Sequence, residues 1–147
     1  MYSHLLVATD GSKLSDKAVT QAIALAKATK ASITLFHATL NIPQAVYADG
    51  VSVQMTPPSD YMKQAKAHAA KILDRAAKKA QAAGVSCATS HAVSDAPWEA
   101  ILAAAKKAKA DTIVMASHGR RGLAGLLLGS ETTKVLTHSK IPVLVVR

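Results

Sequence analysis

Five short apolar segments alternate with longer segments of helical periodicity, and this alternation restricts the chain to few folds. The apolar segments are residues 5–8, 32–36, 85–89, 112–116 and 142–146. Most are apolar at both odd and even positions, which is typical of strands that helices cover on both faces. Strands that alternate with helices in this way form parallel sheets through right-handed crossovers. We therefore predict a doubly wound α/β fold, with a five-stranded parallel sheet and four helices, of the flavodoxin-like or Rossmann-like type.

The predicted helices have recognisable ends. Ser12 is placed to cap the first helix, and Gly84 is a natural stop for the second. Ser94 or Asp95 is expected to cap the third. Residues 39 to about 57 break the periodic pattern. A loop of that length in a compact domain usually has a function, such as a lid or a contact surface, or is mobile.

Composition indicates one folded domain over residues 1–147, because 50% of the residues are hydrophobic and a chain of this length buries a sizeable core. Cys87 is the single cysteine, so an intrachain disulfide is excluded. No apolar run approaches the roughly 20 residues of a membrane helix. The N-terminus lacks the basic start and apolar stretch of a signal peptide. We therefore expect a cytoplasmic protein with no membrane partner.

The net charge of +9, from 18 Lys and Arg against 9 Asp and Glu, is compatible with a polyanionic partner. The basic residues are spread in ones and twos along the helices, and aromatic residues that could stack on bases make up only 3% of the chain. A solvated helix face is the favoured interpretation. Binding of nucleic acid, whose signature would be a steep dependence on salt, remains an alternative.

Polar residues follow three of the predicted strands. Asp10 follows the first, His37 the second, and Ser117 and His118 the fourth. The carboxyl ends of parallel strands share one edge of the sheet, and flavodoxin-like winding would place the first and fourth strands on either side of the ligand crevice. Asp10 could accept a hydrogen bond from a ribose hydroxyl or a base amine there. It could also form an Asx turn within its own loop, and both roles can hold together.

The loop after the fourth strand is rich in glycine and ends at a last predicted helix, at about residues 131–137. Its glycines and arginines are Gly119, Arg120, Arg121, Gly122, Gly125 and Gly129. Glycine lets backbone N–H groups approach an anion closely. A helix N-terminus favours phosphate, and the Ser130 hydroxyl can add a hydrogen bond. A plain turn is the alternative, but the glycine-serine pair at a helix start favours a phosphate-binding loop.

Other chemistries have weaker support. The loop has no Gly-Lys-Ser or Gly-Lys-Thr sequence, so it is not a Walker A loop. Ser117 is not in a Gly-x-Ser-x-Gly nucleophile elbow, which argues against a hydrolase triad. His37, His91 and His118 fall near strand ends, but their spacing is not typical of metal ligands. The chain also has no pair of cysteines that could complete a metal site. We assign no catalytic residue and no metal ligand.

These segments together resemble the universal stress protein family, in its ATP-binding branch, over nearly the whole chain. The resemblance is carried by Val7-Ala-Thr-Asp-Gly-Ser12, Asp95-Ala-Pro-Trp-Glu-Ala-Ile101, Met115-Ala-Ser-His-Gly-Arg-Arg-Gly122, Leu128-Gly-Ser130 and Pro142-Val-Leu-Val-Val146. The branch carries Gly, two residues, Gly, nine residues and then Gly-Ser or Gly-Thr. Gly119, Gly129 and Ser130 match this pattern, and Ala116 stands at the first glycine position. The resemblance implies an adenine nucleotide alpha hydrolase-like fold with strand order 3-2-1-4-5.

The resemblance also implies a ligand and a role for each matched position. ATP, with Mg²⁺ on its phosphates, would be the cofactor. Adenine and ribose would be contacted by Asp10 and by the backbone around Ala8 and Ala38, with Met115 and Ala116 lining the ribose region. The phosphates would be held by Gly119, Gly129, Ser130 and the backbone of Glu131.

The resemblance further implies a homodimer through the last strand, Val143 to Val146. An apolar strand at a sheet edge would otherwise be an aggregation hazard, and pairing with a second copy would cover it.

We expect an ATP-binding stress-response regulator without high-turnover catalysis. Two alternatives stay open. One is a stress protein of the same fold that binds no nucleotide. The other is a weak ATPase or phosphotransferase in which Ser130 or a loop residue accepts phosphate.

Overall fold

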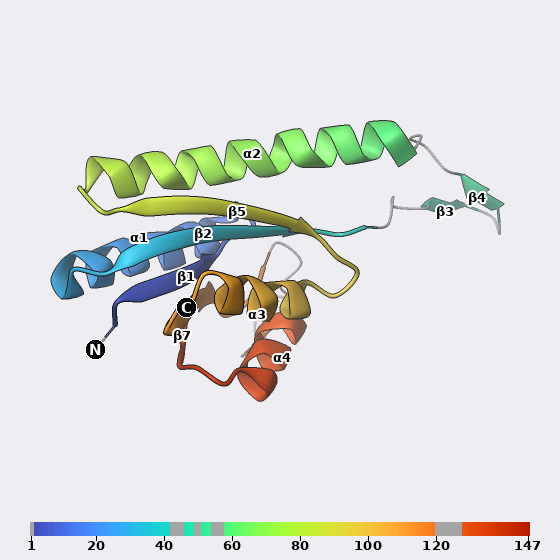
Figure 1. The fold of residues 1–147 in the computed structure, drawn as a ribbon. Coiled ribbons are helices and arrows are strands. Elements are labelled where there is room, and N and C mark those ends of the chain that lie inside the picture. Colours follow the sequence, from blue (N-terminus) through green and yellow to red (C-terminus); the bar gives the residue numbers. More distant parts are fainter. Residues whose placement is uncertain (1, 42–45, 49–50, 54–57, 120–127) are drawn as a thin grey trace.

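The computed structural model describes residues 2–41, 46–48, 51–53, 58–119 and 128–147 (Figure 1). Its elements follow in the order β1 (His4–Ala8), α1 (Lys13–Thr29), β2 (Ser32–Thr39), β3 (Val46–Ala48), β4 (Val51–Val53), α2 (Pro58–Ala82), β5 (Cys87–Val93), α3 (Pro97–Lys107), β6 (Thr112–Ala116), α4 (Ser130–His138) and β7 (Val143–Val146). Within these described ranges, no helix is long and apolar enough to cross a membrane.

Five parallel strands form the main sheet in the order β5-β2-β1-β6-β7. Numbered along the chain within that sheet, this is the order 3-2-1-4-5, so the predicted fold class is confirmed. β3 and β4 form a separate antiparallel pair between β2 and α2. They lie within the segment of residues 39–57 that was expected to be a loop. The remaining residues of that segment, apart from residues 39–41, lie outside the described part of the chain.

Helices cover both faces of the sheet, as the apolar runs indicated (Figure 1). α1 and α2 pack on one face, while α3 and α4 pack on the other. Leu5 and Val7 of β1 belong to the core beneath α1 and α2. Leu6 between them joins Phe36 and Ile113 in the core beneath α3. All three β1 side chains are fully buried, which explains why the strand sequence does not alternate between apolar and polar residues.

Two of the three predicted helix ends are confirmed. Ser12 caps α1, because its hydroxyl accepts a hydrogen bond from the Ser15 N–H at 3.2 Å. Gly84 follows α2 with a φ of +72°, a left-handed conformation that glycine adopts without a steric penalty.

The predicted cap of the third helix is wrong. The N-cap residue of α3 is Ala96, which has no side-chain hydrogen bond to the helix. Ser94 instead forms a turn ahead of the helix, since its hydroxyl accepts the Ala96 N–H at 3.1 Å. A carboxylate oxygen of Glu131, from α4, accepts the Trp98 N–H at 2.8 Å. An acceptor from a distant helix therefore satisfies this end of α3.

The third strand of the sheet begins later than predicted. We expected residues 85–89, whereas β5 runs from Cys87 to Val93. Val85 is buried, but its N–H donates to the Ala80 carbonyl at 3.0 Å, so it belongs to the turn that closes α2. A buried apolar residue in a turn was thus mistaken for the start of a strand.

Candidate functional site

The loop that follows β1 is held in a tight turn at the carboxyl edge of the sheet. Oδ1 of Asp10 accepts a hydrogen bond from the Ser12 N–H at 3.0 Å. The hydroxyl of Thr9 accepts the Gly11 N–H at 3.2 Å. Gly11 has a φ of +77°, which requires a residue that tolerates the left-handed region. The Asx-turn role considered for Asp10 is therefore confirmed, and it fixes the direction of the carboxylate.

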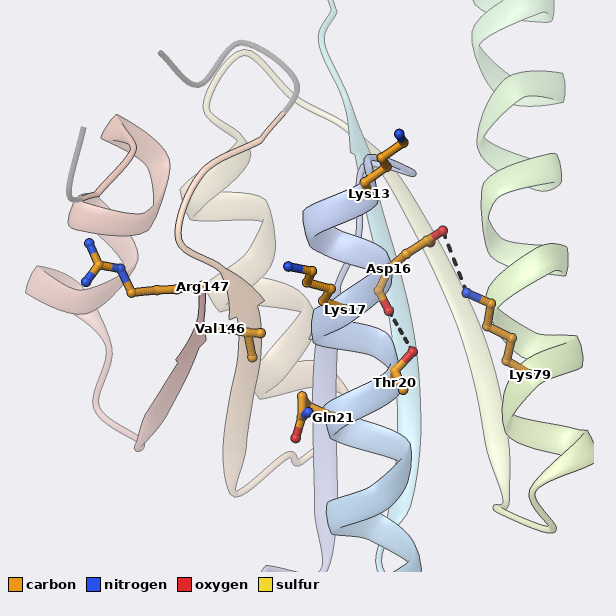
Figure 2. Close-up of a pocket in the computed structure, with 8 residues that line it drawn as sticks. All are labelled: Lys13, Asp16, Lys17, Thr20, Gln21, Lys79, Val146 and Arg147. Carbon is orange, nitrogen blue, oxygen red and sulfur yellow. Dashed lines mark hydrogen bonds and ion pairs between the residues drawn. The ribbon is translucent and has the colours of Figure 1, made fainter. Parts of the chain in front are cut away.

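A side chain of α2 forms a hydrogen bond with the backbone of this loop. Nη2 of Arg75 donates to the Gly11 carbonyl at 3.0 Å and pairs with the Asp16 carboxylate at 3.1 Å. Figure 2 shows the second cation on Asp16, the Lys79 ammonium at 3.6 Å, reaching across from α2 to α1. Because these side chains are partly exposed, each ion pair contributes little to stability. The hydrogen bond to Gly11 ties the Asp10 loop to α2, and the ion pairs join α1 to α2.

Asp10 and Gly119 lie against each other, as the shared edge of β1 and β6 predicted. A Cβ atom placed on Gly119 would stand 2.6 Å from Oδ2 of Asp10, a distance that Cβ atoms in proteins essentially never show. The carboxylate thus occupies the space that a side chain at position 119 would need. This close approach gives a physical reason for glycine at the second position of the family pattern.

Hydrogen bonds hold the start of α4 against the end of β6. The Gly129 N–H donates to the Ser117 carbonyl at 2.7 Å, and the Thr132 hydroxyl donates to the Ala116 carbonyl at 3.0 Å. A Cβ on Gly129 would stand 3.2 Å from Cα of His118, so a side chain at position 129 would crowd the His118 backbone. Gly129 is the N-cap and has no side chain to accept the N–H groups of the first turn. The positive end of the helix dipole is therefore placed beside the end of β6.

The side chain of Glu131 is used for structure. One carboxylate oxygen accepts the Trp98 N–H of α3, and the other lies 3.5 Å from the Lys134 ammonium. Only the backbone of Glu131 remains for the phosphate contact that the resemblance implies. No local sequence pattern indicates this contact, because Trp98 and Glu131 are 33 residues apart.

His37 supports the end of β1 from the neighbouring strand. Its Nδ1 lies 2.8 Å from the Thr9 carbonyl, which can only accept, so Nδ1 carries the proton. Burial lowers the pKa of His37, and nearby His91 and His68 lower it further, against the opposing effects of the Thr9 hydrogen bond and the Asp10 charge. The neutral ring is therefore the favoured form at pH 7.

The rings packed against His37 were not foreseen from the sequence. His91 of β5 stacks on it with a centroid distance of 6.0 Å, and His68 of α2 meets it edge-on at 6.4 Å. Within the described part of the chain, no group of three or more histidine, cysteine or acidic side chains is arranged to hold a metal ion.

Four predicted site residues contribute mainly backbone to this edge. Met115 is 5% exposed and packs beneath α3, and Ala116 is 7% exposed and packs beneath α1. Ala8 and Ala38 are partly buried against the core on the α3 side.

Residues 120–127 of the glycine-rich loop, including Arg120, Arg121, Gly122 and Gly125, lie outside the described residues.

Known proteins share both the sequence and this fold. The sequence model of the universal stress protein family matches residues 1–147. Universal stress protein YxiE of Bacillus subtilis is 34% identical over 151 residues, covering 100% of each chain. A universal stress protein solved in complex with cAMP is 31% identical, with a TM-score of 0.73 and coverage of 99% of this chain and 97% of that one. UspA from Lactobacillus plantarum superposes with a TM-score of 0.78 at 24% identity, covering 99% of this chain and 98% of that one. The chain belongs to the universal stress protein family.

Proposed function

We propose that this chain binds an adenine nucleotide, with ATP as the leading candidate, at the carboxyl edge between β1 and β6. The observation that carries the proposal is the placement of the α4 N-terminus against the end of β6, where Gly129 leaves the first turn without a side-chain cap. The relative in complex with cAMP supports an adenine nucleotide as the ligand class.

Charge determines how the nucleotide would lie. The carboxylate of Asp10 repels phosphate and suits a ribose hydroxyl or a base amine, so the nucleoside belongs on the β1 side. The N-terminus of α4 attracts anions, so the phosphates belong beside Gly129, the Ser130 hydroxyl and the Glu131 backbone. Met115, Ala116, Ala8 and Ala38 would offer backbone atoms between these two ends. Mg²⁺ would accompany the phosphates and reduce their repulsion by Asp10.

The proposed role is regulatory and cytoplasmic, without rapid turnover. The two carboxylates of the site, on Asp10 and Glu131, each accept a hydrogen bond from a backbone N–H group. Each carboxylate is thereby committed to holding the backbone. The His37 ring is likewise committed to the Thr9 carbonyl. These side chains are therefore suited to shaping a binding site rather than to activating a water molecule.

Calorimetric titration of the purified protein with ATP, AMP and cAMP, each with Mg²⁺, tests the proposal. Gly129→Val should abolish binding, because its side chain would press on the His118 backbone at the proposed phosphate end. Ala103→Val, on the exposed face of α3, adds similar bulk elsewhere and should bind as the wild type does. If the wild type shows no heat at millimolar ATP and releases no nucleotide on denaturation, the chain is a non-nucleotide member of the family. Unchanged affinity in Gly129→Val would place the site elsewhere.

We also propose that two copies pair through β7. This strand forms one edge of the sheet, and Leu144 on it is 42% exposed. A cleft of about 300 Å³, lined by Lys13, Lys17, Val146 and Arg147 among others, lies beside it (Figure 2). Leu144→Lys should shift the sedimentation equilibrium to monomer, because a charge would replace apolar contact. Leu136→Lys, at a leucine of α4 that is 40% exposed, is the matched control and should leave the mass unchanged. A wild type that sediments as a monomer would contradict this pairing.

A further inference from the structure

The outer edge of β5 has backbone groups that can pair with another strand. β5 is the last strand on its side of the sheet. The Ser86 carbonyl accepts the Ile33 N–H, and the Ser94 N–H donates to the Thr39 carbonyl, each at 2.9 Å. Since the N–H and C=O of successive strand residues point to opposite sides, the backbone groups of Cys87, Thr89, His91 and Val93 point away from β2. Among the described residues, no strand pairs with this edge.

β5 lacks several of the features by which proteins usually protect a sheet edge. Its sequence, Cys-Ala-Thr-Ser-His-Ala-Val, contains no lysine, acidic residue, proline or glycine. Its register with β2 runs without a bulge from Ile33 opposite Cys87 to Thr39 opposite Val93. Lysine, proline and bulges are the common devices that block strand addition. This edge is therefore regular and long enough to accept another strand.

α2 lies alongside this strand (Figure 1). A groove runs between the two elements. The groove has a volume of about 600 Å³. Its lining includes Ala69, Leu73 and Ala77 from the helix and Cys87 and Thr89 from the strand, together with the charged side chains of Lys66 and Asp74. A groove between an edge strand and a helix is suited to β-augmentation. In that mode the added strand bonds to the edge backbone, and every second side chain enters the groove.

The basic side chains of α2 favour an acidic segment as the occupant of this groove. α2 carries six Lys and Arg residues and two Asp residues. Asp74 pairs with Lys78, while Arg75 and Lys79 pair with Asp16. Lys66 lines the groove close to His91, whose pKa is lowered by burial and then by the charge of Lys66. A second copy would bring another basic α2 beside this one and be repelled. An acidic strand would be attracted.

We propose that the outer edge of β5 and the groove beside α2 form a docking site for an extended acidic segment of a partner protein. The segment adds to the sheet as a further strand next to β5. Its small or medium apolar side chains enter the groove at alternate positions, and its carboxylates lie near Lys66. The site is separate from the proposed nucleotide crevice, and its occupation does not depend on nucleotide.

The test uses synthetic heptapeptides and the full-length protein. The acidic probe is acetyl-Glu-Val-Glu-Val-Glu-Val-Glu-amide. The first control replaces each glutamate with lysine, and the second is the acidic peptide with alternate backbone nitrogens methylated, in both possible registers. Amide chemical shifts of ¹⁵N-labelled protein give the affinity and the location. We expect the acidic peptide to bind and to shift the amides of Thr89 and His91. The lysine peptide should not bind, and one methylated register should lose binding.

Two variants localise the contact. Thr89→Pro removes an outward N–H and no bond to β2, so it should abolish binding. Lys66→Glu should weaken binding about two- to tenfold, since an exposed attraction becomes a repulsion. Lys106→Glu, on the opposite face, is the matched control and should bind like the wild type. If Thr89→Pro fails to fold, the methylated peptides still test the backbone contact with wild-type protein. No binding of the acidic peptide, equal binding of the lysine peptide, shifts confined to another surface, or self-association that Thr89→Pro removes would each overturn the proposal.

Discussion

Alanine at Gly119 should destabilise the protein because of one contact. The new methyl group would meet Oδ2 of Asp10 at 2.6 Å, whereas ordinary contact begins near 3.4 Å. The carboxylate must therefore retreat by about 0.8 Å. It cannot turn freely, since its other oxygen holds the Ser12 N–H at 3.0 Å. Overpacking of this kind costs about 1–3 kcal/mol, and replacing a glycine returns about 0.4–1 kcal/mol through the unfolded chain. The expected net loss is about 1–2 kcal/mol.

A double-mutant cycle isolates that contact. Asp10→Ser keeps an oxygen for the turn but is too short to reach position 119. In that background Gly119→Ala should be neutral or slightly stabilising, which gives a coupling energy of about 1–3 kcal/mol. Urea unfolding of the four proteins provides the free energies. In the wild-type background we expect a Tm lowered by roughly 2–8 °C.

Gly84→Ala is the matched control for this cycle. No atom lies within 4 Å of a Cβ placed there, but its φ of +72° makes alanine cost about 1–2 kcal/mol through backbone strain alone. That cost should be the same with Asp10 or Ser at position 10. If Gly119→Ala destabilises both backgrounds equally, the Asp10 contact is not the reason for glycine, and our account of this edge is wrong.

Two further predictions concern contacts that the sequence did not show. Glu131→Ala should cost about 1–3 kcal/mol in urea unfolding by leaving the Trp98 N–H without its acceptor, whereas Glu131→Gln, which keeps an acceptor, should cost clearly less; equal losses would indicate that the charge matters rather than the bond. The pKa of His37 in the folded protein lies below its ordinary value of 6.5. As pH falls, the unfolded chain therefore binds a proton at this residue before the folded protein does. The stability that His37 contributes is complete above pH 6.5 and declines as pH falls below it. His37→Gln should therefore lose less stability between pH 7 and pH 5 than the wild type, and identical slopes would refute this assignment.

The sequence could predict the fold because local pattern and tertiary burial coincide. Leu5, Leu6 and Val7 are all buried, two facing one helical layer and one facing the other. That arrangement appears in the sequence as an unbroken apolar run. The edge strand β5 was harder to delimit, because Val85 is buried in a turn and the strand itself is half exposed. Burial alone does not distinguish a turn from a strand.

The site was predictable only where neighbouring strands imply proximity. Asp10 and Gly119 were expected at one edge because β1 and β6 were expected to be adjacent, and they are in contact. His68 could not be placed beside His37, since it lies within a helix whose rotation depends on packing against the whole sheet. The Glu131 contact with α3 depends on how two helices sit together on one face. Such contacts between distant elements leave no periodic signal in the sequence.

Mapping the amide shifts of ¹⁵N-labelled protein during titration with ATP and Mg²⁺ tests the central claim most directly. It reports where the nucleotide binds as well as whether it binds. We predict the largest changes at Gly129, Ser130 and Glu131, where the phosphates would meet the start of α4, and further changes at Asp10 and Gly119. An absence of shifts at millimolar ATP, or shifts confined to a surface away from β1 and α4, would contradict the proposed nucleotide site.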